Sequence, residues 1–179
     1  MLFRSIADTV AHKYGTGSGA SPLLSGYLPC HQMLINKLLG WKHKNFGMLF
    51  NSGFMANQAL VKTLPGKHDL ILVDKYIHHS IAQALNRSST RFKRYNHLDL
   101  CHLEELLSDH TSNYDTIFVI TESIFSMDGD YPDLKRLVEL KKKYHFVLML
   151  DEAHGTGVLG NSGAGLAEET GTSNEVDII

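Results

Sequence analysis

Cysteine is scarce in this chain, and long apolar runs are missing. Its two cysteines, Cys30 and Cys101, are too few for a disulfide framework and favour reduced thiols in the cytoplasm. No stretch approaches the roughly 20 consecutive apolar residues that span a bilayer. The first residues lack the charged start and apolar core of a signal peptide. We therefore expect a cytoplasmic protein with no membrane partner.

An excess of one charge sign is also absent. The formal net charge is -2, with no basic cluster and no acidic tail, so we expect no nucleic-acid partner. The 179 residues, 43% of them hydrophobic, suffice to bury the core of roughly one domain. The composition therefore indicates an ordinary globular protein and leaves its function to the motifs.

Apolar runs and helical patterns alternate along most of the sequence. Helical spacing is expected at residues 1–14 and 27–39, with Gly40 ending the second helix. Further helices are expected at 55–64, 80–86, 100–107 and 134–144. Strands are expected at 46–50, 69–74, 91–95, 116–121 and 146–150, with a further one beginning at 176–179. This alternation predicts an α/β fold with a mainly parallel sheet flanked by helices.

The apolar run at 146–150 ends on Asp151, and His154 follows three residues later. A strand rich in buried residues should end on an acid only where that acid has a partner. The carboxyl ends of parallel strands are also where open α/β sheets bind ligands. Asp151 is therefore a candidate to hold a protonated pyridine nitrogen, with His154 beside it. A structural acid–imidazole pair is the alternative.

A second candidate segment is Ser52-Gly53-Phe54, which follows an expected strand and opens a helix. Free backbone N–H groups and the helix dipole favour an anion at such a position, so a phosphate site is predicted. An ordinary helix cap with a tight turn is the alternative.

Polar groups follow two other strands and would converge on the same rim. His78 and His79 come shortly after the strand that ends at residue 74, and an imidazole there can stack on a flat ring or bind a metal. A helix start with a solvated histidine is the alternative. Glu122 and Ser126 lie in the polar stretch 121–130, whose Asp-Gly pair is by itself a turn signal.

Three other motif interpretations are disfavoured. Asp151-Glu-Ala-His154 spells a helicase acidic box, but the sequence has no matching phosphate loop upstream. The GxGxxG match at 155–160 does not turn directly from a strand into a helix. A metal site built from Asp151, Glu152, His154, His78 and His79 lacks any recognised ligand spacing, so we expect no metal.

Taken together, the segments resemble the α-oxoamine synthases. The motifs that carry the resemblance are Gly-Ser-Gly-Ala-Ser at 17–21, Ser-Gly-Phe-Met-Ala-Asn at 52–57, His-His-Ser at 78–80, Glu-Ser-Ile-Phe-Ser-Met-Asp-Gly-Asp at 122–130 and Asp-Glu-Ala-His-Gly-Thr-Gly at 151–157. The family has PLP-dependent transferase fold type I, uses pyridoxal 5'-phosphate (PLP), and joins an amino acid to an acyl-CoA or acyl-ACP with loss of carbon dioxide.

The resemblance also implies roles for individual residues. The backbone N–H groups of Gly53 and Phe54 would hold the cofactor phosphate, and His78 would stack on the pyridine ring. Asp151 would pair with the ring nitrogen, and His154 would bond the phenolic oxygen; these two are the expected catalytic residues.

Three further residues are expected in the pocket. Ser126 would lie near the same phenolic oxygen, and Glu122 would line the pocket. His31 matches a family histidine without a firm role. Residues 24–32 and 53–58 are most similar to the member that condenses L-alanine with a pimeloyl thioester in biotin biosynthesis. Members such as glycine C-acetyltransferase, 5-aminolevulinate synthase and serine palmitoyltransferase stay open.

The resemblance also sets the expected organisation of the chain. Residues 1–40 are expected to form an amino-terminal helical and loop segment, and residues 41–179 part of the PLP-binding large domain. The family's cofactor-binding lysine has no counterpart in a matching context, so we expect an amino-terminal part that does not turn over alone. Family members are homodimers. A non-catalytic α/β module that binds a partner is the alternative from another class.

Overall fold

The computed structural model describes residues 2–179, which form two compact units. The first contains the residues up to Gly40 together with 45–49, and the second contains 41–44 and 50–179. No helix among the described residues is long and apolar enough to cross a membrane.

Two helices supply the regular structure of the amino-terminal part, and both were predicted: α1 (Leu2–Tyr14) and α2 (Pro29–Lys42). The prediction that Gly40 ends α2 is wrong, because the helix continues to Lys42. The left-handed residue that follows the helix is His43, with φ 53°. The backbone therefore reverses three residues after Gly40, and the glycine lies inside the helix.

The strand predicted at 46–50 is also wrong, because this segment has no strand structure. Phe46 is 92% exposed and Met48 is 77% exposed. A strand needs a partner to satisfy its backbone N–H and C=O groups, and among the described residues this segment pairs with none. Its apolar residues alone therefore do not place this segment in the sheet.

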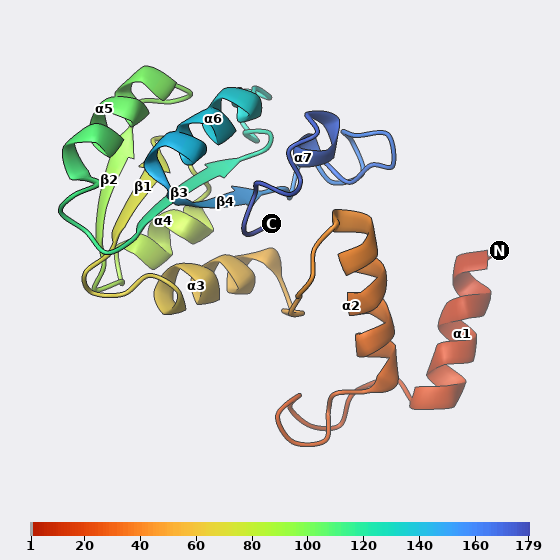
Figure 1. Ribbon diagram of the computed structural model, residues 1–179. Coiled ribbons are helices and arrows are strands. Elements are labelled where there is room, and N and C mark those ends of the chain that lie inside the picture. Colours follow the sequence, from red (N-terminus) through yellow and green to blue (C-terminus); the bar gives the residue numbers. More distant parts are fainter. Residues whose placement is uncertain (1) are drawn as a thin grey trace. The chain divides into compact units, whose positions relative to one another are not determined.

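The second unit contains a four-stranded sheet in the order β2-β1-β3-β4, in which every neighbouring pair is parallel (Figure 1). The strands are β1 (Leu70–Asp74), β2 (Arg91–Tyr95), β3 (Ile117–Glu122) and β4 (Val147–Asp151). These four predicted strands are confirmed. Because the strands are parallel, their carboxyl ends lie at one edge, where Glu122 is in register with Asp151.

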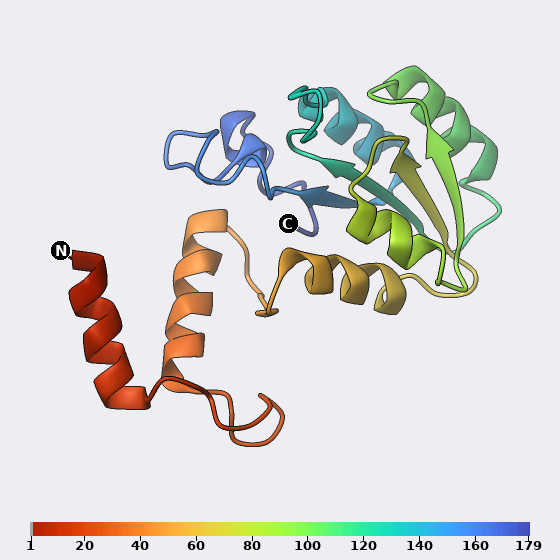
Figure 2. The ribbon, with the colours of Figure 1, turned by 180° about the vertical axis from the view of Figure 1, so that it is seen from behind.

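Helices cover both faces of the sheet (Figures 1 and 2). One face carries α3 (Gly53–Thr63) and α4 (His79–Leu85), and the other carries α5 (Leu100–His110), α6 (Leu134–Tyr144) and the short α7 (Leu166–Glu169). Alternate residues of β1 serve the two cores: Ile71 and Val73 pack toward α3 and α4, and Leu70 and Leu72 toward α5 and α6. This two-sided burial explains why the strands read as continuous apolar runs.

The strand predicted at 176–179 is reduced to one parallel bridge between Ile178 and Met149. The N–H of Ile178 donates to the carbonyl of Leu148 over 3.1 Å, and the N–H of Leu150 donates to the carbonyl of Ile178 over 2.9 Å. Residues 176–179 therefore pair with β4 without forming a regular strand.

Candidate active site

Asp151 ends β4 and is half-buried, and hydrogen bonds hold both of its carboxylate oxygens. Oδ2 accepts from Nδ2 of Asn57 over 2.8 Å, and Oδ1 accepts from the N–H of Ala153 over 3.0 Å. Nδ2 of Asn57 also donates to Oγ of Ser80 over 3.0 Å. One buried amide on α3 therefore connects the carboxylate of β4 with the first turn of α4.

The amino end of α3 has the features of an anion site. Oγ of Ser52 caps the helix by accepting from the N–H of Met55 over 3.2 Å. The first N–H groups of a helix have no intrahelical partner, and within residues 2–179 no other acceptor is found for those of Gly53 and Phe54. A Cβ added to Gly53 would meet nothing within 4 Å, so the space in front of this turn is open. The sequence allowed either an ordinary helix cap or a phosphate site here, and the structure contains both the cap and the free N–H donors.

His78 and Glu122 are joined at the same edge. The N–H of His78 donates to Oε1 of Glu122 over 2.5 Å, and Nδ1 of His78 accepts from the N–H of Ser80 over 3.2 Å as the cap of α4. The His78 side chain is otherwise exposed. Burial raises the pKa of the Glu122 carboxyl to about 7, and the charges of Asp151 and Asp74 add to this, while the His78 N–H opposes it.

A third group of polar residues escaped the sequence interpretation. Asp74, which ends β1, is fully buried and accepts from Nδ1 of His97 over 2.8 Å. Nε2 of His97 lies 3.0 Å from Oδ2 of Asp130. Burial alone would lower the pKa of His97, but the hydrogen bonds and charges of these two carboxylates outweigh burial and raise it. An acid at the end of a buried strand was the available signal for Asp74, and the sequence interpretation used it for Asp151 and Glu122 but not for Asp74.

The remaining predicted residues are less constrained. His154 and Ser126 are exposed, and their side chains make no hydrogen bond within the described part of the chain. His31 belongs to the first unit, where its Nδ1 accepts from the N–H of Leu28 over 2.9 Å and its ring stacks on Tyr27 at 5.6 Å. The hydrogen bonds thus unite Asp151, Glu122 and His78, while His154 and Ser126 lie on neighbouring exposed turns.

The site gathers groups that suit a ligand with two opposite charges. Three carboxyl groups, those of Asp74, Glu122 and Asp151, lie at the strand ends, and free N–H donors lie at the start of α3 on the same helix as Asn57. A protonated pyridine nitrogen fits the half-buried carboxylate of Asp151, and a phosphate fits the donors. PLP carries both groups, so the residues present fit it. Among residues 2–179, no group of three His, Cys, Asp or Glu side chains is arranged to hold a metal.

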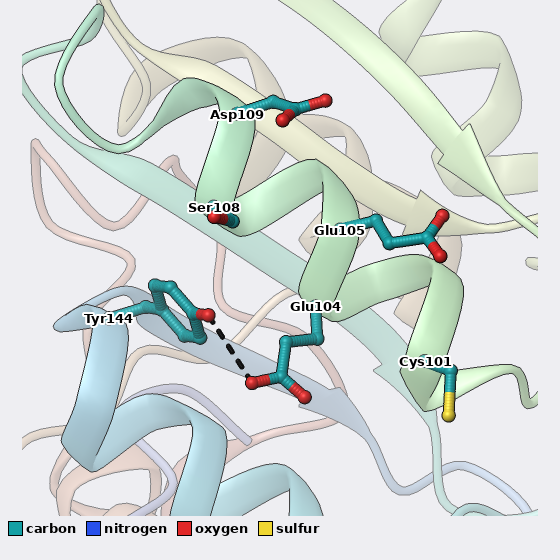
Figure 3. Close-up of a pocket in the computed structure, with 6 residues that line it drawn as sticks. All are labelled: Cys101, Glu104, Glu105, Ser108, Asp109 and Tyr144. Carbon is teal, nitrogen blue, oxygen red and sulfur yellow. Dashed lines mark hydrogen bonds between the residues drawn. The ribbon is translucent and has the colours of Figure 1, made fainter.

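A separate pocket lies against α5 and α6, on the other face of the sheet (Figure 3). It is lined by Cys101, Glu104, Glu105, Ser108, Asp109 and Tyr144. Oη of Tyr144 donates to Oε1 of Glu104 over 3.2 Å, and Nζ of Lys143 donates to the same oxygen over 2.8 Å. These contacts join the two helices, and no predicted site residue lies among them.

Solved structures with the same fold confirm the predicted fold class. A serine palmitoyltransferase from S. paucimobilis, solved with PLP and myriocin, superposes with a TM-score of 0.90 at 27% identity over 96% of this chain and 43% of that one. An 8-amino-7-oxononanoate synthase from Francisella tularensis superposes with a TM-score of 0.73 at 32% identity over 91% of this chain and 44% of that one. The chain therefore has part of a PLP-dependent transferase fold, with a parallel four-stranded sheet flanked by helices.

Sequence comparison gives the same family. The chain is 42% identical to the 8-amino-7-oxononanoate synthase of Geobacter sulfurreducens over 99% of this chain and 45% of that protein. It is also 42% identical to the enzyme of that name from Chlorobaculum parvum, over 93% of this chain and 43% of that protein. The chain thus spans less than half the length of these relatives. Residues 5–178 match the family described as aminotransferase class I and II, and the chain belongs to that family.

Proposed function

We propose that the chain is the PLP-binding part of an 8-amino-7-oxononanoate synthase. This enzyme condenses L-alanine with pimeloyl-CoA or pimeloyl-ACP, with loss of carbon dioxide, in biotin biosynthesis. The relatives of that name and the α-oxoamine synthase motifs support the assignment. The observation that carries it is the anchored carboxylate of Asp151, which Asn57 ties to the helix that begins with the free N–H groups of Gly53 and Phe54.

When bound, PLP provides an electron sink for the negative charge that develops on the α-carbon of the amino acid. In our proposal Asp151 keeps the ring nitrogen protonated, because an ionised carboxylate beside it stabilises the positive charge. The hydrogen bonds from Asn57 and Ala153 hold that carboxylate ionised and oriented. Gly53 and Phe54 bind the phosphate through their N–H groups.

Four side chains complete the proposed site. His78 would contact the pyridine ring, and its backbone N–H donates to Glu122. The exposed side chains of His154 and Ser126 would donate to the phenolic oxygen of PLP. Glu122 lines the pocket with a carboxyl that is about half protonated near neutral pH, since its pKa is about 7.

The finer parts of the proposal concern the whole enzyme. Residues 1–40 form the amino-terminal segment and residues 41–179 the cofactor-binding part, which acts in a cytoplasmic homodimer. His31 contributes to the substrate side of the site. No lysine of the printed sequence lies in the context of the family's cofactor-binding lysine, so this 179-residue chain alone is expected not to turn over. The observation against a non-catalytic module is the presence of the family motifs at 52–57, 78–80, 122–130 and 151–157, which would contact the cofactor.

A second candidate is a serine palmitoyltransferase-like activity, favoured by the higher TM-score of 0.90 against 0.73. We prefer the synthase because identity is higher to proteins of that name, at 42%, than to the palmitoyltransferase, at 27%. Backbone similarity reports the shared fold, whereas the side chains select the substrate.

The cofactor proposal is tested with pyridoxamine 5'-phosphate, which lacks the aldehyde and cannot react with surface lysines. Its own fluorescence is titrated with the wild-type chain, Asp151→Asn, and Asp128→Asn as the control. Asp128 is an exposed acid of the neighbouring loop. We expect Asp151→Asn to weaken binding by about tenfold or more, since a hydrogen bond to a charged group contributes roughly 1.5–3 kcal/mol. Equal affinity of all three proteins would refute the assignment of Asp151.

The substrate proposal is tested with stable phosphopyridoxyl amino acids in the same assay. Phosphopyridoxyl-L-alanine should bind more tightly than phosphopyridoxyl-L-serine if the chain belongs to the biotin-pathway enzyme. Tighter binding of the serine adduct would favour the palmitoyltransferase-like alternative.

A further inference from the structure

His97 lies between two loops that carry proposed cofactor contacts. The first loop follows β1 and contains Tyr76 and His78. The second follows β3 and contains Ser126 and Asp130. His97 itself belongs to the turn after β2, and its ring nitrogens bond Asp74 and Asp130, neither of which is a proposed cofactor contact. Its side chain is 16% exposed, and its ring packs against Tyr76 and Phe125, each at 4.5 Å between ring centroids.

The buried carboxylate of Asp74 fixes the first loop to His97. Oδ1 of Asp74 accepts from the N–H of Tyr76 over 2.8 Å and from Nδ1 of His97 over 2.8 Å. Oδ2 accepts from the N–H of Leu98 over 2.9 Å. The chain two residues before His78 is therefore held against the turn that carries His97.

The other ring nitrogen fixes the second loop. Nε2 of His97 bonds Oδ2 of Asp130 over 3.0 Å, and the second oxygen of Asp130 is buried without a hydrogen bond to any described residue. The loop is closed on itself, because the N–H of Phe125 donates to the carbonyl of Asp130 over 2.9 Å and the N–H of Gly129 donates to the carbonyl of Phe125 over 2.8 Å. Holding Asp130 therefore also restrains Ser126, which lies inside this closed turn.

We propose that His97 is a positioning residue that braces the His78 loop against the Ser126 loop through Asp74 and Asp130. This inference rests on the proposed function, because it concerns the two loops that carry the proposed cofactor contacts His78 and Ser126. Without His97 the two loops would no longer be held in a fixed position relative to each other. The ligand would then have to order the two loops on binding, which lowers its affinity.

The charges around the ring favour its protonated form, in which both nitrogens donate. Asp74 faces it from β1 and Asp130 from the loop after β3. The carboxyl of Glu122 is close enough for the charge of His97 to lower its pKa. The rings of Tyr76 and Phe125 close the remaining sides. Loss of Asp130 should therefore lower the pKa of His97, which a ring titration by NMR measures directly.

The test is a double-mutant cycle with pyridoxamine 5'-phosphate as the probe. His97→Phe keeps the ring packing and removes both hydrogen bonds, and Asp130→Asn weakens only the contact with the second loop. We expect each single variant to weaken binding by about tenfold, the effect of one charge-assisted hydrogen bond, and the double variant to be no weaker than His97→Phe. The control Asp128→Asn, an exposed acid of the same loop, should bind like the wild type. Wild-type affinity in both single variants, or additive losses in the double variant, would overturn the proposal.

Backbone hydrogen exchange of the ligand-free chain separates this proposal from the proposed function. The proposal predicts faster amide exchange at residues 126–130 in Asp130→Asn and in His97→Phe. In the double variant the exchange rate should be no faster than in His97→Phe. If Asp151→Asn and wild type bind the probe equally while exchange changes as expected, the proposed function fails and the brace stands. Unchanged exchange at 126–130 in folded Asp130→Asn, together with an unchanged pKa of His97, would refute the brace even if the probe binds.

Discussion

Replacing Glu122 with glutamine should remove a pH-dependent loss of stability. Glu122 is 4% exposed, and the pKa of its carboxyl rises from an ordinary 4.5 to about 7 in the folded chain. The folded state therefore holds this proton more tightly than the unfolded state does. Between pH 4.5 and 7 the folded state binds more protons, so the free energy of unfolding falls as the pH rises, and it levels off above pH 7.

The size of this effect follows from the shift. Each pKa unit corresponds to about 1.36 kcal/mol, so the shift of Glu122 corresponds to at most about 3 kcal/mol by about pH 8. A glutamine at this position would have no proton to release, and its side-chain oxygen could still accept from the N–H of His78. The stability of Glu122→Gln relative to wild type should therefore increase with pH over this window.

Urea unfolding followed by tryptophan fluorescence measures this difference. Trp41 is the single tryptophan of the chain and lies in the second unit, where its Nε1 donates to the carbonyl of Ser162 over 3.0 Å. Glu105→Gln, at an exposed position of α5, is the matched control and should show no pH-dependent difference. A difference between Glu122→Gln and wild type that stays constant from about pH 4 to about pH 8 would contradict the reasoning.

Three further substitutions test the packing. Gly165→Ala should cost at least about 2 kcal/mol, because its φ is 106° and its Cβ would lie 2.2 Å from Oε2 of the buried Glu152; urea midpoints should show no comparable loss for Gly17→Ala, where nothing lies within 4 Å. Gly40→Ala should stabilise α2 by about 0.5–1 kcal/mol, because Gly40 lies inside the helix with no atom near its missing Cβ. The melting temperature measured by circular dichroism should therefore rise, and a lower temperature would contradict this. Leu103→Ala, at a fully buried position of α5, should cost about 2–5 kcal/mol in urea unfolding, and a loss below about 1 kcal/mol would mean that the core there is misassigned.

The sheet was predictable because its strands are buried on both faces. Residues 70–74 and 147–151 read as continuous apolar runs that end on an acid, and residues 117–122 differ only in Thr121 before the acid. Residues 46–50 show the limit of the same argument. Their apolar residues are typical of a strand, but a strand requires a hydrogen-bonding neighbour. The sequence does not reveal whether such a neighbour is available.

In the candidate site, too, some features were predictable from the sequence and others were not. Local chemistry sufficed to single out Asp151, the helix start at Ser52-Gly53 and the turn at His78, because each is a strand end or a helix start that sequence patterns mark directly. The link between Asp151 and Asn57 joins residues 94 positions apart. Such a contact depends on how α3 packs on the sheet.

By itself, then, the sequence determined the α/β class, the parallel strands and the polar residues at their carboxyl ends, since these follow from local periodicity and burial. Only the tertiary structure decided that His97 joins Asp74 to Asp130 and that burial raises the pKa of Glu122. Both depend on distances between separate strands and on the exclusion of water, and neither quantity is encoded in any short stretch of residues.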